Sequence, residues 1–209
     1  MAQFAPTVIS PGKLALKRFV DIIGGIVGTV LSLPIILIVA IPLKIESPGP
    51  LIFKQQRVGK NGRIFNIYKL RSMYQDAEER KKALMEQNKM DGHMFKMDND
   101  PRITKVGKFI RKTSIDELPQ FWNVLKGDMS LIGPRPERPF FVDKFKEEIP
   151  RYMIKHQVRP GMTGWAQVNG LRGDTSIRKR IELDLFYIEN WSVSFDIRIL
   201  FLTVFKGFV

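Results

Sequence analysis

The sequence predicts a mainly helical α+β protein, with a small β-hairpin that follows an N-terminal membrane helix. Three observations support this fold class. The segment from Ile22 to Leu43 contains no charged residue. Two short runs rich in aromatic and β-branched residues come next, Leu51–Gln55 and Arg63–Lys69, and a turn with two glycines separates them. Much of the remaining chain favours helices.

The uncharged segment would form a straight helix about 33 Å long, close to the roughly 30 Å thickness of the hydrocarbon core. A signal peptide is disfavoured because the run is long and no small-residue cleavage site precedes Lys44. A core helix of a soluble protein would usually show a polar stripe, which this run lacks. The segment is therefore predicted to lie in a membrane.

Pro34 divides this segment, because it removes the amide that would bond the carbonyl of Val30 and so kinks the helix. The hydroxyl of Ser32 can bond a carbonyl near the kink. Basic residues flank the segment on both sides, and the positive-inside rule places such flanks in the cytoplasm. Both flanks can obey the rule only if the helix enters and leaves on one face, so a re-entrant hairpin is at least as plausible as a straight span.

Composition narrows the classes of partner and cofactor. The chain holds 34 Lys and Arg against 21 Asp and Glu, a formal net charge of +13. This excess indicates an anionic partner, which can be nucleic acid, anionic membrane lipids or a phosphorylated substrate. Without cysteine, neither disulfides nor thiolate zinc sites can form. A catalytic metal is therefore expected to be a hard cation bound by carboxylate and phosphate oxygens.

We expect residues 1–46 to form the N-terminal segment with its membrane helix, and residues 47–209 to form the second domain. Turn residues at 47–50 separate the two. The helices expected in the second domain are Tyr74–Met90, Val106–Lys112, Leu118–Lys126, Glu137–Lys155, Ser176–Asn190 and Phe195–Phe208. The last of these is strongly apolar, which fits either a core helix or an amphipathic helix in the membrane interface.

Two adjacent carboxylates, Asp116 and Glu117, lie just upstream of Pro119 and downstream of basic residues. One interpretation is a capping box from Ser114 to Glu117. Pro119 argues against it, because a helix capped by Ser114 would place proline where an amide is needed. We instead expect the helix to begin no earlier than Asp116, which would be its cap, with the helix dipole keeping both carboxylates ionised. A site for a metal and a phosphate is the competing functional interpretation.

Arg135 stands between two prolines, which restrict the backbone and pre-orient its guanidinium for two-point phosphate contacts. A proline-rich structural loop is the alternative. A further block runs from Arg159 to Gly170, where three glycines and a Pro-Gly turn allow the backbone to approach a ligand closely.

Taken in order, these motifs resemble the bacterial sugar transferases, which are monotopic polyprenyl-phosphate phosphoglycosyl transferases. The resemblance rests on Tyr68–Met73, Ser114–Gln120, Asn123–Ser130, Gly133–Pro136 and Arg159–Gly170. It extends from about Lys17 to the C-terminus.

The resemblance implies transfer of a sugar-1-phosphate from a UDP-sugar to undecaprenyl phosphate, with UMP as the second product. Asp116 matches the nucleophile, and Glu117, with Asp116 beside it, would hold Mg²⁺. Lys69, Arg111 and Arg135 match basic residues near the active site, and Arg159 is a further candidate for binding phosphate.

The resemblance also places the protein in the bacterial inner membrane, with the catalytic domain on the cytoplasmic face. The family breaks its re-entrant helix at a Ser-Pro pair, whereas this chain has Leu33-Pro34 with Ser32 one residue earlier. We therefore expect the kink to persist and leave the bonding role of the serine open.

Two other classes of protein were weighed. A nucleic-acid-binding protein would use the positive charge, but the membrane segment and the lack of a recognised binding motif count against it, so we expect no nucleic acid. A non-catalytic membrane scaffold is disfavoured by the intact Asp116–Glu117 pair. The sequence fixes neither the sugar nor the oligomeric state, for which a homodimer is one option.

Overall fold

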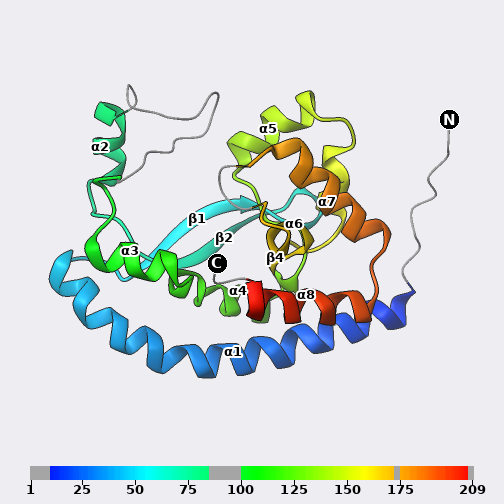
Figure 1. Ribbon diagram of the computed structural model, residues 1–209, viewed down its shortest axis with the longest axis horizontal. Coiled ribbons are helices and arrows are strands. Elements are labelled where there is room, and N and C mark those ends of the chain that lie inside the picture. The colour runs from blue at the N-terminus through cyan, green and yellow to red at the C-terminus, as the bar shows by residue number, and fades with distance from the viewer. Residues whose placement is uncertain (1–9, 85–99, 172–174, 207–209) are drawn as a thin grey trace.

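The computed structural model describes residues 10–84, 100–171 and 175–206, and shows a mostly helical protein with two small sheets (Figure 1). The α-helices are α1 Pro11–Glu46, α2 Ala77–Leu84, α3 Lys105–Lys112, α4 Gln120–Lys126, α5 Pro139–Glu148, α6 Trp165–Val168, α7 Ile177–Glu189 and α8 Val193–Lys206. The strands are β1 Ile52–Val58, β2 Ile64–Leu70, β3 Ser130–Ile132 and β4 Gly161–Thr163. Short 3-10 helices are η1 Lys60–Gly62, η3 Ile115–Glu117 and η4 Tyr152–Gln157.

The predicted β-hairpin is confirmed. Strands β1 and β2 pair antiparallel from Ile52 opposite Leu70 to Val58 opposite Ile64. The turn between them contains Asn61, whose backbone is left-handed at φ 56°. Strands β3 and β4 form a second, parallel pair. Because parallel strands need a long connection, α5 and η4 lie between them in the chain.

Helix α1 is one continuous helix that bows beneath the rest of the molecule (Figure 1). Its buried residues are Asp21, Gly25, Ser32, Val39 and Leu43. Their spacings of four and seven residues place them on a single face. This face packs on α4 and α3, so α1 lies along the body for most of its length instead of projecting from it.

Two prolines stand inside α1, Pro34 and Pro42. From the sequence, a kink is predicted only at Pro34, although Pro42 removes a second helical amide in the same way. The hydroxyl of Ser32 donates to the carbonyl oxygen of Thr29 at 2.9 Å, so Ser32 does bond a carbonyl near the kink. The chain bends at this region without leaving the helix, and a sharp hairpin within α1 is not observed.

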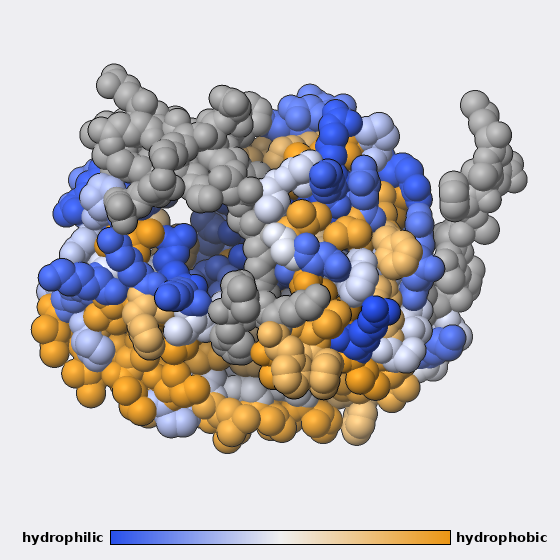
Figure 2. All heavy atoms as spheres, viewed as in Figure 1, coloured by the Kyte–Doolittle hydropathy of each residue, from blue (hydrophilic) through white to orange (hydrophobic). Residues whose placement is uncertain are grey.

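Helix α1 is, among the described residues, the one helix long and apolar enough to cross a membrane by length and composition. Its outer face exposes large apolar side chains from Leu14 to Ile45. Ile197, Phe201 and Phe205 of α8 are exposed as well. Figure 2 shows this apolar surface as an orange band along α1, with hydrophilic side chains gathered above it. The molecule thus has an apolar side and a polar side.

Several predicted helices are confirmed with small shifts at their ends, namely α3, α7 and α8. The prediction of one helix over Glu137–Lys155 is wrong in its second half. Helix α5 ends at Glu148, Pro150 cannot continue it, and Arg151 adopts a left-handed backbone at φ 64° before η4 begins. Of the predicted helix Tyr74–Met90, the part after Leu84 lies outside the described residues.

Candidate active site

The two adjacent carboxylates lie on a tight turn that joins α3 to α4. Ser114 has a left-handed backbone at φ 57° and makes no capping bond with its side chain, so the capping box is excluded. Asp116 and Glu117 occupy η3, and α4 begins only at Gln120, with Pro119 at the position before it. The expectation that Asp116 caps this helix is therefore wrong, because the proline shifts the helix start past the carboxylates.

Glu117 binds two cations from distant parts of the chain. Its Oε1 accepts from the Nζ of Lys69 at 2.6 Å and from the Nη2 of Arg135 at 3.0 Å. Lys69 comes from β2 and Arg135 from the loop after β3. These side chains keep between 18% and 30% of their surface exposed, so a ligand can still reach the cluster.

The two carboxylates differ in their electrostatics. Burial opposes ionisation of Glu117, but the positive charges of Arg135 and Lys69 outweigh it and hold the pKa of Glu117 well below its usual range. Asp116 is 8% exposed, and burial together with the charge of Glu117 raises its pKa, against the attraction of Lys69 and Arg111. The pKa of Glu117 is thus shifted in the direction that favours the ionised form, and the pKa of Asp116 is shifted in the opposite direction.

Arg111 lies in the last turn of α3, three residues before the turn that carries Asp116. Its side chain is exposed, and its charge acts on Asp116 at a distance. The structure thus brings Lys69 and Arg135 onto Glu117, with Arg111 near enough for its charge to act on Asp116. This arrangement can neutralise a phosphate group that approaches Asp116.

The loop that carries Arg135 is fixed by residues that sequence reasoning missed. Arg57 of β1 donates from Nη1 to the carbonyl oxygen of Pro136 at 3.0 Å. The carboxylate of Glu137 accepts from Arg180 of α7 at 3.1 Å, and both side chains are buried. Because these partners are far apart in sequence, no local pattern could have indicated them. They hold the backbone just after Arg135 in one position.

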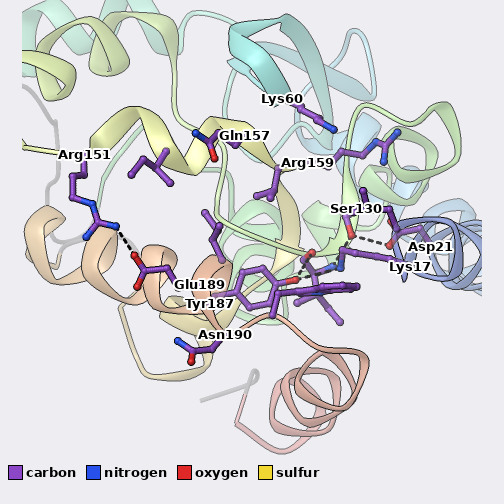
Figure 3. Close-up of a pocket in the computed structure, with 16 residues that line it drawn as sticks. Lys17, Asp21, Lys60, Ser130, Arg151, Gln157, Arg159, Tyr187, Glu189 and Asn190 are labelled. Atoms are coloured by element: carbon purple, nitrogen blue, oxygen red, sulfur yellow. Dashed lines mark hydrogen bonds and ion pairs between the residues drawn. The ribbon is translucent and has the colours of Figure 1, made fainter. Parts of the chain in front are cut away.

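Arg159 is placed elsewhere. Its Nε donates to the carbonyl oxygen of Gly127 at 3.1 Å, just after α4. Its side chain lines a separate cavity of about 710 Å³, to which none of Lys69, Asp116, Glu117 and Arg135 contributes (Figure 3). The structure therefore does not gather Arg159 with the other predicted phosphate ligands.

A magnesium ion fits this donor set only in part. Among the described residues no group of three or more His, Cys, Asp or Glu could hold a metal ion. Asp116 and Glu117 supply hard carboxylate oxygens, and both cation contacts of Glu117 fall on Oε1. Since Mg²⁺ is commonly held by one or two carboxylates and by substrate phosphates, the pair fits an ion that arrives with its substrate.

The bacterial sugar transferase family matches residues 12–209, and the chain belongs to that family. The chain is 49% identical, over 97% of its length, to a UDP-N-acetylgalactosamine-undecaprenyl-phosphate N-acetylgalactosaminephosphotransferase of Aeromonas hydrophila. It is 46% identical, again over 97%, to a UDP-glucose:undecaprenyl-phosphate glucose-1-phosphate transferase of Escherichia coli K12. These matches cover 46% and 42% of the two relatives, so the chain spans less than half of their length.

Another relative consists almost entirely of the region that matches this chain. An exopolysaccharide production protein of Rhizobium leguminosarum bv. phaseoli is 42% identical over 91% of the chain, and the match covers 94% of that relative.

Proposed function

We propose that this protein transfers a sugar-1-phosphate from a UDP-sugar to undecaprenyl phosphate, giving undecaprenyl-diphosphate-sugar and UMP. The observation that carries the proposal is the cluster of Asp116 and Glu117 with Lys69 and Arg135, above an apolar helix that lies along the body. The activities named for the relatives from Aeromonas hydrophila and Escherichia coli support the same reaction class.

In the proposed first step, a carboxylate oxygen of Asp116 attacks the phosphorus that bears the sugar. The bond from this phosphorus to the bridging oxygen breaks, and UMP leaves with the bond electrons. In the second step, a phosphate oxygen of undecaprenyl phosphate attacks the same phosphorus, and the carboxylate of Asp116 is regenerated. Arg135 and Lys69 bind the phosphate oxygens in both steps and reduce the repulsion between anions.

Mg²⁺ is the cofactor that we propose, held by Glu117 and Asp116 together with the diphosphate. When bound, it would supply positive charge to the diphosphate as the bond to UMP breaks. Glu117 also keeps Lys69 and Arg135 in place, because both bind the same oxygen.

The proposed location is the cytoplasmic face of the bacterial inner membrane, with α1 entering and leaving on one side. Both ends of α1 are tied to the same body, which supports this topology. Arg18 donates to the carbonyl oxygens of Val124 and Leu125, and at the other end Glu46 accepts from the amide of Val106 at 2.9 Å. A helix held at both ends cannot carry one end across a bilayer without taking the polar body with it.

The sugar is left open within the class of UDP-hexoses and their N-acetylated forms. The relatives at 49% and 46% identity are named for N-acetylgalactosamine and for glucose, so overall similarity does not separate them. Screening UDP-sugars for UMP release in the presence of undecaprenyl phosphate identifies the substrate.

The decisive experiment uses UDP-sugar and Mg²⁺ without the lipid acceptor. Mass spectrometry should find one sugar-phosphate adduct on Asp116, with UMP released in equal amount. Asp116→Asn keeps the shape of the side chain but not its charge, so it should form no adduct and should unfold at the same denaturant concentration. If UMP appears only when both substrates are present and no adduct forms, Asp116 is a metal ligand or a base instead.

Topology is tested separately in intact cells, using the absence of native cysteine. Gly12→Cys, at the start of α1, and Gln56→Cys, on β1, introduce exposed thiols at the two sides of the membrane segment. Neither should react with a membrane-impermeant reagent until the cells are opened. Labelling of the Gly12 variant alone in intact cells would show that α1 spans the membrane.

A further inference from the structure

The cavity lined by Arg159 is a second site, separate from the catalytic cluster. It lies between α1, β3, η4 and the end of α7, and we call it the α1–α7 cavity. Its volume of about 710 Å³ falls within the usual range for small-molecule sites. Lys17 on α1 and Trp191 after α7 both line it. None of the steps proposed above uses this cavity.

The charges around the cavity are unevenly matched. Lys17 is held by Asp196 at 2.6 Å, and Arg151 is paired with Glu189. Lys60 and Arg159, in contrast, have no carboxylate within ion-pair distance among the described residues. Figure 3 shows both pointing to the same edge of the cavity. This edge therefore carries uncompensated positive charge.

Arg159 is also set up to bind an oxyanion. Its Nε is anchored on the carbonyl oxygen of Gly127, which fixes the direction of the guanidinium. Of its five N–H donors, only this one has a partner within the part of the chain that the structure describes. An oriented guanidinium with free donors next to a lysine suits a phosphate group.

Part of the remaining wall is apolar. Ile132, Val158 and Ile188 line it together with the ring of Tyr187. The hydroxyl of Tyr187 donates to Asp196 at 2.7 Å, and the indole of Trp191 donates to the same carboxylate at 3.1 Å. The ligand should therefore combine a phosphate with an apolar portion.

The cavity is lined in part by α1 and ends close to the start of α8. Leu14, Lys17 and Asp21 contribute one face of α1, and Trp191 stands two residues before α8 begins. With α1 in the membrane interface, as in the proposed function on which this step rests, the cavity is reached from the lipid headgroups. Tryptophan is enriched at that level of the bilayer.

We propose that the α1–α7 cavity binds the phosphate headgroup of an anionic phospholipid, with Lys60 and Arg159 on the phosphate. Bound lipid orients the protein on the membrane through this cavity and takes no part in the transfer reaction.

The test titrates short-chain dihexanoyl phosphatidylglycerol into the full chain in a neutral detergent and follows tryptophan emission. Dihexanoyl phosphatidylcholine, whose headgroup is zwitterionic and has no net charge, is the control. We expect saturable binding of phosphatidylglycerol, with an emission change that is absent from Trp191→Phe. Lys60→Gln should weaken binding several-fold, and the double variant with Arg159→Gln should weaken it by at least about tenfold.

Arg63→Gln is the matched control, because Arg63 follows the same turn and is exposed but does not line the cavity. It should change the affinity less than about twofold. Equal weakening by the Lys60 and Arg63 variants would reduce the effect to general charge and overturn the proposal. The proposal is likewise overturned if UMP, and not the lipid, changes the emission of Trp191, and if this change disappears in the double variant.

Two further measurements keep this proposal separate from the proposed function. Lys60→Gln changes an exposed side chain and gives an answer even if Arg159→Gln does not fold. Asp116→Asn should abolish transfer yet bind phosphatidylglycerol like the unmodified chain. If the unmodified chain binds phosphatidylglycerol but catalyses no transfer, the proposed reaction alone is disproved.

Discussion

Two clusters of charged side chains meet at the Arg135 loop, and they differ chiefly in exposure. At the candidate active site, Glu117 binds Lys69 and Arg135 while all three remain partly accessible. Behind the loop, Glu137 binds Arg180, and Lys155 lies 3.1 Å from Asp184 with both side chains only 2% exposed. Similar residue types therefore serve two purposes. The exposed cluster can exchange partners with a phosphate, and the buried one fixes the loop.

The physical cause of this difference is the cost of removing charges from water. A buried ion pair gains little net stability, but losing one member leaves an uncompensated charge in the interior. An accessible pair can be opened at small cost, because water or a ligand replaces the lost partner. Substitutions in the two clusters should therefore separate stability from activity.

The largest effect is expected from Lys155→Met in the buried cluster. This change leaves Asp184 without its cation and should lower the free energy of unfolding by about 3–5 kcal/mol. Chemical denaturation in detergent measures it. Adding Asp184→Leu removes the stranded charge, so the double variant should recover most of the loss. Equal destabilisation of both variants would show that packing, not charge, sets the cost.

A smaller effect, on activity alone, is expected from Arg135→Lys. A lysine cannot reproduce the planar two-point contact with phosphate, so turnover should fall about a hundredfold with an unchanged denaturation midpoint. UMP release from the UDP-sugar is the assay. Arg138→Lys is the matched control in the same loop, and it should remain active. A fully active Arg135→Lys variant would assign this loop a structural role.

The smallest effect concerns acid stability and His156. Burial, helped by the charge of Lys155, lowers the pKa of His156 to about 4, although Glu137 opposes this. Its ring also packs against Tyr152. In the unfolded chain His156 takes up its proton at a higher pH than in the folded chain. The free energy of unfolding therefore decreases as the pH falls from about 6.5 towards 4.

This contribution amounts to about 2 kcal/mol between pH 7 and pH 5. The free energy of unfolding, measured by denaturation at the two pH values, should therefore differ by about 2 kcal/mol less in His156→Phe than in the unmodified chain. If the variant keeps the full pH dependence, other groups in the buried cluster are responsible.

The features that were predicted correctly from the sequence are those that depend on residues close together in the chain. The hairpin and helices α3, α7 and α8 follow from local composition and spacing, and the structure confirms them. The break after α5 was missed because the helix predicted over Glu137–Lys155 ran through Pro150, which cannot continue a helix. The start of α4 was placed too early for a related reason, since Pro119 moves it to Gln120.

Residues of the candidate site that are far apart in the sequence could be predicted together only because the family resemblance includes them. Lys69 and Glu117 are far apart in sequence, and the family resemblance, not local pattern, brought them together. Arg57 and Arg180 were missed because their effect depends on which strand and helix pack behind the Arg135 loop. Arg159 was assigned to phosphate binding on its motif, and the structure places it in a different cavity.

The junction between α1 and α3 connects the long apolar helix to the candidate active site. The carboxylate of Glu46, at the end of α1, accepts from the first amides of α3, and Arg111 stands at the opposite end of that short helix. The end of α1 therefore helps to position α3, and through α3 it also helps to position Arg111.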